Sequence, residues 1–297
     1  MNERSTGRGL AAALGAHAIW GAMPVYLILV KAVPAIEYVA WRTFFTLPLC
    51  LVILAIRKRL PELRRVLGNR RTVLTLTASA GLVATNWLIY VWSIQQEKVY
   101  AASLGYYLLP LVMLVLGMVV LKERLNRLQW AAAALALAGV AALSAGAITT
   151  LWISLTLALS FGLYGLLRKT VDAGPMVGLT VETLVLLPLV IAYLAWAELA
   201  GGGVALGREL VESLAIVAGG LFTAIPLTLF AFAARSLPYT IVGFVQFTSP
   251  TIVFLLGLLV FGEELRPAQL ACFVAIWAAV ALFSWDLWRR SGRPVEA

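Results

Sequence analysis

Polar and aromatic side chains recur at helical spacing inside long apolar segments, where an unpartnered polar group is costly. Ser79, Asn86, Tyr90 and Ser93 form one such stripe. Neutral hydrogen-bonding groups among aromatic rings favour a zwitterionic or neutral solute over phosphates, and the rings can hold an ammonium group. The predicted solute-contacting residues are His17, Trp20, Ser79, Asn86, Tyr90, Ser103, Tyr106, Ser160, Tyr164, Phe230 and Gln246.

Each of these residues also has a structural interpretation. A single Tyr, Trp or Phe fits helix packing or an interfacial anchor. Asn86 and Gln246 fit hydrogen bonds between helices equally well. His17 fits three roles, as a ligand contact, a proton carrier or a packing residue with satisfied hydrogen bonds. The residue types alone leave these alternatives open.

Long membrane-embedded helices must position these residues. The chain has 297 residues, of which 62% are hydrophobic and 12% charged, with a mean hydropathy of +0.94. A soluble domain carries about a quarter charged residues, so a soluble protein, a disordered chain and a disulfide scaffold are excluded. Cys50 and Cys272 lie in apolar runs and are interpreted as packing residues.

Ten apolar segments are long enough to cross the ~30 Å hydrocarbon core as helices, and no barrel-like alternation is present. They span residues 10–30, 37–56, 72–95, 100–121, 127–146, 151–167, 177–199, 211–234, 240–261 and 267–288. The first segment is expected to be retained rather than cleaved. Spans 1, 3, 4, 6, 8 and 9 carry the polar and aromatic residues and are expected to line a cavity, whereas spans 5 and 10 suit the periphery.

The distribution of Lys and Arg predicts the orientation of these spans. With both termini in the cytoplasm, 18 Lys and Arg residues fall on the cytoplasmic side and 4 on the other side. This bias predicts an N-in, C-in topology with ten spans. The basic loop 57–71, which also holds several leucines, is expected to lie on the inner leaflet as a topology anchor rather than as a regulatory lipid site.

A shift of 140 residues aligns the two halves of the chain, predicted as repeats 1–147 and 148–297. Across 101–144 and 241–284, 12 of 44 positions are identical, including the pairs Pro110 and Pro250, and Glu123 and Glu263. Five spans per half is an odd number, so the repeats must have inverted topology, which is typical of alternating-access transporters. The predicted fold is therefore an all-α membrane protein of ten helices in two inverted five-helix repeats.

Two charges and four prolines within the spans have predicted mechanical roles. Arg42 and Glu182 are equivalent in the repeats, so they are expected near opposite membrane faces and are not paired with each other. For Glu182, Arg168 and Lys169 lie within reach. A structural salt link or gate is favoured for both charges over proton coupling. The predicted hinge or kink residues are Pro24, Pro110, Pro226 and Pro250.

Several motifs together resemble a known family. They are the runs 86–93, 102–106, 123–125, 159–169 and 182–184, with Pro110, Gln129-Trp130, Gly243-Phe244, Gln246 and Pro250-Thr251. The set is similar to EamA-type transporters of the drug/metabolite transporter (DMT) superfamily, most closely the RarD-like branch, across nearly the whole chain. The resemblance implies a ten-helix bacterial inner-membrane carrier. Its relatives export amino acids and other metabolites, and include the YddG-type aromatic amino-acid exporters.

An enzyme is disfavoured, because the chain has one His and lacks an H-E-x-x-H motif, a P-loop and paired intramembrane aspartates. No cofactor or metal is expected. We expect a secondary-active or facilitative carrier that exports amino acids, aromatic or other large neutral ones favoured, or similar small metabolites. The alternatives are an exporter of drugs, related to chloramphenicol, or of other metabolites, and less favourably a channel. The expected partners are a small-molecule substrate and membrane lipids, without nucleic acid, and a working monomer is compatible with the internal repeat.

Overall fold

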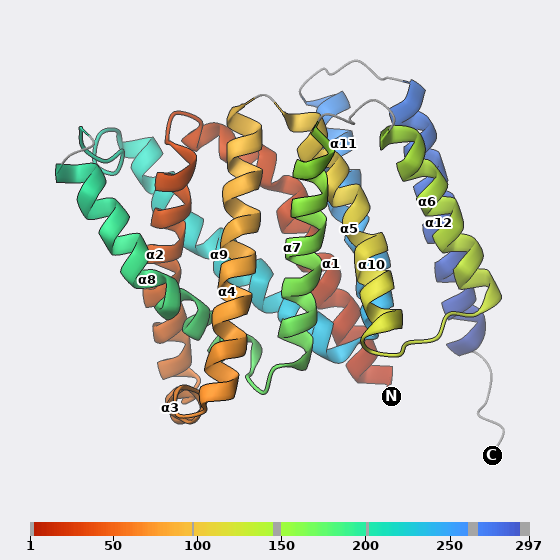
Figure 1. Ribbon diagram of the computed structural model, residues 1–297, viewed down its shortest axis with the longest axis horizontal. Helices are drawn as coiled ribbons and strands as arrows, with labels where there is room; N and C mark the ends of the chain where they lie inside the picture. Colours follow the sequence, from red (N-terminus) through yellow and green to blue (C-terminus); the bar gives the residue numbers. More distant parts are fainter. Residues whose placement is uncertain (1–2, 97, 145–149, 200–201, 261–266, 292–297) are drawn as a thin grey trace.

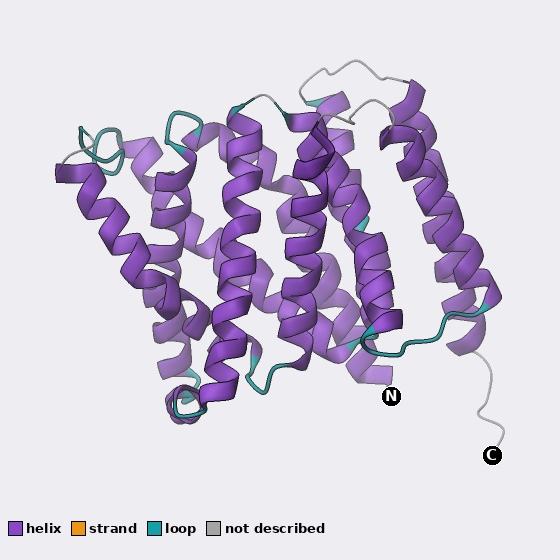
Figure 2. Cartoon of the chain, in the orientation of Figure 1, coloured by secondary structure: helices purple, strands orange, loops and turns teal. Residues whose placement is uncertain are grey.

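The computed structural model describes residues 3–96, 98–144, 150–199, 202–260 and 267–291, and every regular element in these ranges is helical (Figure 2). The helices are α1 (Glu3–Leu27), η1 (Ile28–Val30), α2 (Ala35–Ile56), α3 (Leu60–Leu67), α4 (Arg70–Gln95), α5 (Val99–Val119), α6 (Arg127–Ser144), α7 (Leu151–Thr170), α8 (Pro175–Leu199), α9 (Leu210–Ser236), α10 (Tyr239–Gln246), α11 (Thr248–Leu259) and α12 (Pro267–Ser291). The all-α prediction is confirmed for this part of the chain.

Within the described residues, nine helical stretches are long and apolar enough to cross a membrane. The predicted fifth span, α6, is shorter, with an apolar part of Arg127–Ala142, so a tenth crossing stays a prediction. The sixth predicted span is longer than expected, because α7 continues through Arg168 and Lys169 to Thr170. These two charged residues can remain helical inside the bundle because both have protein partners.

The predicted ninth span is interrupted at Phe247, between α10 and α11. Pro250 has no amide hydrogen to donate to the carbonyl of Gln246, which weakens the helix at this point. Its repeat equivalent, Pro110, lies inside the uninterrupted helix α5. Gly243 of α10 packs against Pro110, and a Cβ added at Gly243 would lie 3.1 Å from the Pro110 carbonyl oxygen. The two equivalent prolines are therefore in different local structures.

Helices α6 and α12 lie side by side at one edge of the bundle (Figure 1). Gly139 permits their close approach, because a Cβ there would lie 2.8 Å from the Cβ of Ala275. The main apolar cluster instead draws residues from α1, α2, α4, α5, α7, α8, α9 and α10. The interior of the bundle thus excludes the two helices that correspond to predicted spans 5 and 10.

Helix pairs recur in the order that the 140-residue shift requires. Helix α1 packs on α9 as α7 packs on α4, and α5 packs on α7 as α11 packs on α1. The beginning of α1 and the end of α12 lie on the same side of the bundle (Figure 1). Glu263, the repeat partner of Glu123, lies outside the described residues.

The basic loop 57–71 contains the short helix α3. Leu63 and Val66 are buried against α4 and α8, whereas Leu60 and Leu67 are exposed. Glu62 accepts a hydrogen bond from the Gly174 amide at 3.2 Å. Protein contacts therefore hold one face of α3, and its two exposed leucines are free to contact lipid.

Candidate functional site

Five of the side chains from α1, α7 and α9 form a central aromatic cluster, defined as His17, Trp20, Phe161, Tyr164 and Phe230. The ring centroids of Trp20 lie 5.4 Å from His17, 5.3 Å from Phe161 and 5.7 Å from Phe230. Phe161 and Phe230 are 5.0 Å apart, and Tyr164 stacks near Phe230 at 6.2 Å. Four residues predicted from the sequence thus meet in one place, with Phe161 as an addition.

His17 is fully buried, and its polar groups are only partly satisfied. The Ser249 hydroxyl donates to the backbone carbonyl of His17 at 2.8 Å and lies 3.4 Å from its Nδ1. Within the described residues, His17 Nε2 and the Gln246 side-chain oxygen have no hydrogen-bond partner. Buried polar atoms normally have a partner, so these two atoms are candidates for contact with a solute.

The polar stripe on α4 mainly joins helices. Asn86 donates to the Leu157 carbonyl at 2.9 Å and to the Ser160 hydroxyl at 3.1 Å, which ties α4 to α7. Ser79 donates to Glu182 Oε1 on α8 at 2.5 Å. Of the two roles left open for Asn86, the geometry shows the hydrogen bond between helices. Solute contact by Ser79, Asn86 and Ser160 stays a prediction.

Glu182 forms a fully buried ion pair with Arg168. Arg168 is one of the two cations that the sequence placed within reach of Glu182. The Arg168 Nη1 and Glu182 Oε1 atoms are 3.5 Å apart, and each side chain is 1% exposed. Arg168 Nη2 also donates to the Pro175 carbonyl at 2.6 Å. The pair therefore fixes the turn between α7 and α8.

Gly178 makes room for this ion pair, because a Cβ at this position would overlap Arg168 Nη1. We expect Gly178→Ala to lower the free energy of unfolding by about 1–3 kcal/mol through overpacking. The matched control is Gly81→Ala in α4, where a Cβ would meet nothing within 4 Å. Thermal unfolding of the purified protein in detergent would show a lower Tm for the first variant only; equal values would mean that Arg168 can move aside freely.

Arg42 occupies a separate site, defined as the arginine site: Arg42, Tyr38, Trp87 and Thr223. Its guanidinium carbon lies 4.1 Å from the Trp87 ring centroid and 5.6 Å from that of Tyr38. Its Nε donates to the Thr223 hydroxyl at 2.8 Å. As predicted, Arg42 and Glu182 are not paired with each other. The arginine site joins α2, α4 and α9.

Tyr90 and Tyr106 form an edge-to-face pair, with centroids 5.3 Å apart. Both rings are partly exposed although they pack on the main apolar cluster. Trp20 shares these two properties. Ser103 lies partly exposed on α5. These side chains are placed to contact a small molecule inside the bundle, which stays a prediction.

Besides Phe161, four residues at these sites were missed by the sequence analysis. Tyr38, Trp87 and Thr223 hold Arg42, and Ser249 holds His17. Trp87 and Tyr38 could have been found, because each lies four residues or fewer from a predicted residue on its own helix. Thr223 and Ser249 also lie close to the predicted Pro226 and Pro250 on their own helices, but their partners, about 180 and 230 residues away, could not be found from the sequence.

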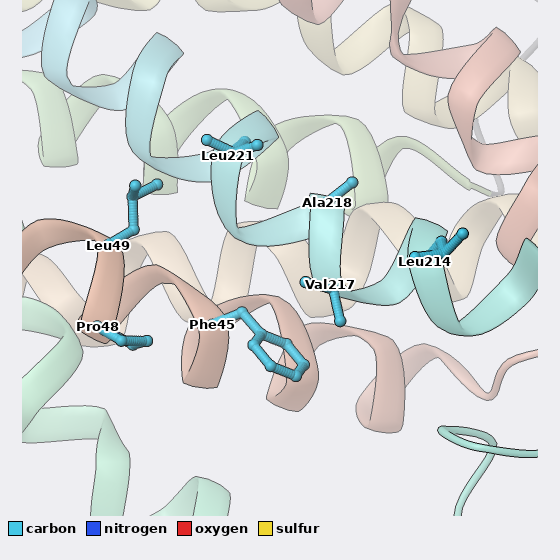
Figure 3. Close-up of a pocket in the computed structure, with 7 residues that line it drawn as sticks. All are labelled: Phe45, Pro48, Leu49, Leu214, Val217, Ala218 and Leu221. Atoms are coloured by element: carbon cyan, nitrogen blue, oxygen red, sulfur yellow. The ribbon is translucent and has the colours of Figure 1, made fainter. Parts of the chain in front are cut away.

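A groove of about 420 Å³ lies between α2 and α9 and has a different character. Figure 3 shows its lining residues, which are all apolar: Phe45, Pro48, Leu49, Leu214, Val217, Ala218 and Leu221. None of them belongs to the predicted solute-contacting set. Leu214, Val217 and Leu221 are exposed, so this groove suits contact with lipid chains rather than recognition of a polar solute.

Three comparisons place this arrangement among known proteins. Residues 7–145 match the EamA-like transporter family. "Uncharacterized transporter PA0485" of Pseudomonas aeruginosa is 41% identical, covering 95% of both chains. "Protein RarD" of Streptomyces exfoliatus is 36% identical, covering 98% of this chain and 92% of its own. "Protein RarD" of Escherichia coli is 34% identical, covering 96% and 97%.

The fold is also found in a solved structure. One crystal structure, described only as that of a protein, has a TM-score of 0.70 to this chain at 17% identity, covering 95% of this chain and 97% of its own. The fold likeness and the relatives agree with nine membrane-spanning stretches in the described residues. The chain is therefore a multi-pass bacterial inner-membrane transporter rather than an enzyme, and it belongs to the RarD-like branch of the drug/metabolite transporter superfamily.

Proposed function

We propose that this transporter exports amino acids, with aromatic or other large neutral ones favoured, or similar small metabolites. The central aromatic cluster carries this proposal. It offers flat apolar surfaces for a large side chain, next to the unpartnered Nε2 of His17. An apolar site with a few directed polar groups is typical of small-molecule recognition. Transport then follows the gradient of the substrate or a coupled ion, because the chain has no P-loop for ATP.

Alternating access between two inverted repeats is the proposed mechanism, with ten spans and both termini in the cytoplasm. The recurring helix pairs and the basic bias of one side support it. Several contacts join helix ends on the proposed cytoplasmic side. Lys169 Nζ donates to the carbonyls of Ala234 and Leu237 at 2.7 and 2.6 Å, and Arg235 donates to the Val171 carbonyl at 2.6 Å. In this proposal, the described conformation is closed to the cytoplasm.

Counterflow in proteoliposomes tests the proposal. Vesicles are preloaded with one amino acid of a panel, and uptake of its labelled form is followed. We expect saturable exchange for aromatic or large neutral amino acids. We expect His17→Ala and Tyr90→Ala to weaken the apparent affinity by about tenfold, because each removes roughly 1–2 kcal/mol of contact with the substrate.

The matched control for these variants is Trp130→Ala. Trp130 is 53% exposed on the peripheral helix α6, so its loss should leave the affinity unchanged. If no amino acid of the panel is exchanged by protein that is shown to be folded, amino-acid export is rejected.

Export of drugs or other metabolites is the second candidate. One relative, at 31% identity over 95% of the chain, is named "Chloramphenicol-sensitive protein RarD" of Pseudomonas aeruginosa. The same vesicles preloaded with chloramphenicol would separate the two candidates. Saturable exchange of chloramphenicol without exchange of any amino acid would favour the second.

A further inference from the structure

We propose that Arg42 recognises a carboxylate on the transported solute, so that the substrates of this transporter are amphipathic carboxylic acids. This inference rests on the proposed transport function and makes its substrate class specific. It starts from two arginines that are buried in the described part of the chain. Arg168 and Arg42 are 1% and 3% exposed, and among the described residues Arg168 has a carboxylate partner whereas Arg42 has none.

Within the described part of the chain, no carboxylate lies within 4.0 Å of the Arg42 guanidinium. A buried charge without a counter-ion is costly in a membrane protein and marks a functional site by default. The rings of Trp87 and Tyr38 offset part of this cost through cation–π contact. Rings cannot replace a carboxylate, however, so the site retains affinity for an anion.

The edge of the guanidinium that carries Nη1 and Nη2 is the edge that a carboxylate would bind. Thr223 accepts a hydrogen bond from Nε and donates its own proton to the Gly219 carbonyl at 2.7 Å. No hydrogen bond is formed by Nη1 or Nη2 with any described residue. Because Arg binds carboxylates through a planar fork of N–H groups, a side chain fixed at Nε is pre-organised for such a ligand.

The depth of the arginine site also fits transport. Thr223 is the fourteenth of the 27 residues of α9 and Arg42 is the eighth of the 22 residues of α2, so the arginine site lies well inside two membrane-spanning helices. Alternating-access carriers bind substrate near the midplane. The partly exposed rings of Tyr90 and Tyr106 pack on the same apolar cluster as Tyr38 and Trp87, the two rings that contact Arg42.

The arginine site and the central aromatic cluster are joined by continuous apolar packing. Tyr38 and Trp87 of the arginine site and Phe161, Tyr164 and Phe230 of the central aromatic cluster belong to one continuous apolar cluster, on which Trp20, Tyr90 and Tyr106 pack. A solute with its carboxylate on Arg42 can place its apolar body on these rings. A neutral solute without a carboxylate would leave the guanidinium uncompensated and bind poorly.

Binding to the full-length protein in lipid nanodiscs tests this, with two acid–amide pairs as probes. The pairs are L-phenylalanine with L-phenylalaninamide, and phenylacetate with phenylacetamide. We expect the wild type to bind each acid about 10–100-fold more tightly than its amide, the range typical of a charge-assisted pair of hydrogen bonds. In Arg42→Gln, the ratio of the affinity for the acid to the affinity for its amide should fall to near one. Arg42→Lys should keep only part of the preference for the acid.

The control is Lys31→Gln, which removes an exposed cation on the proposed outer side and should leave the ratio unchanged. If Arg42→Gln does not fold, Thr223→Val keeps Arg42 but removes the hydrogen bond to Nε, together with the one to the Gly219 carbonyl, and it should reduce the acid-to-amide affinity ratio severalfold. Equal affinity for acid and amide in the wild type, or no binding of either acid, would overturn the role of Arg42. Tight binding of phenylacetate without exchange of any amino acid would instead keep Arg42 as the anion site and reject amino-acid export.

Discussion

Replacing Arg168 by methionine is expected to lower the free energy of unfolding by about 3–5 kcal/mol, because it leaves the buried Glu182 carboxylate without a counter-ion. The two side chains are each 1% exposed, so water cannot replace the lost partner. Ser79 would still donate to Glu182 Oε1, but one hydroxyl does not balance a full charge. Arg168→Met would also lose the hydrogen bond to the Pro175 carbonyl.

Thermal unfolding in detergent, with urea titration where it is reversible, would measure this loss. The double variant Arg168→Met/Glu182→Met should recover much of it, because replacing a whole buried ion pair with apolar side chains is often neutral or stabilising. Arg42→Met is the matched control: Arg42 leaves no buried carboxylate behind, so we expect a change within about 1 kcal/mol. An equal loss for both arginines would contradict this account of the ion pair.

Much of the fold was predictable because hydrocarbon imposes a simple rule on sequence. Each crossing requires a long apolar helix, and the bounds of α2, α4 and α8 lie within a few residues of the predicted ones. The rule is weak at helix ends, where charges have protein partners. Lys169 donates to the carbonyls of Ala234 in α9 and of Leu237 directly after it, which lets α7 continue beyond its apolar part and which hydropathy cannot predict.

The candidate site was predictable only in part, because helical spacing shows which residues share a face and not which faces meet. On α1, His17 and Trp20 are three residues apart and their rings do meet. The polar residues of the α4 stripe instead form hydrogen bonds to two different helices: Ser79 to α8 and Asn86 to α7. Likewise, the sequence showed that Arg42 is an intramembrane charge, but its contacts with Trp87 and Thr223 depend on packing between distant helices.

Replacing Glu123 by alanine is expected to loosen the contact between the two halves on the proposed cytoplasmic side. The Glu123 carboxylate accepts hydrogen bonds from the backbone amides of Tyr239 at 2.6 Å and Thr240 at 2.9 Å. These amides are in the first turn of α10, where no intrahelical partner exists and the helix dipole favours an anion. Glu123 follows α5 in the first half, whereas α10 belongs to the second. The two charge-assisted hydrogen bonds together should contribute about 2–4 kcal/mol to the stability of this contact. The value is at the lower end for two such bonds because Glu123 is partly exposed.

Hydrogen–deuterium exchange of the nanodisc-embedded protein would measure this change at the amides themselves. We expect exchange at Tyr239 and Thr240 to accelerate at least about tenfold in Glu123→Ala, because a local opening that costs about 1.4 kcal/mol less is ten times more populated. Glu62→Ala is the control, since Glu62 accepts from the Gly174 amide in the turn between α7 and α8. It should speed exchange at Gly174 and leave α10 unchanged. If α10 exchanged at the wild-type rate without Glu123, this contact would not hold the two halves together.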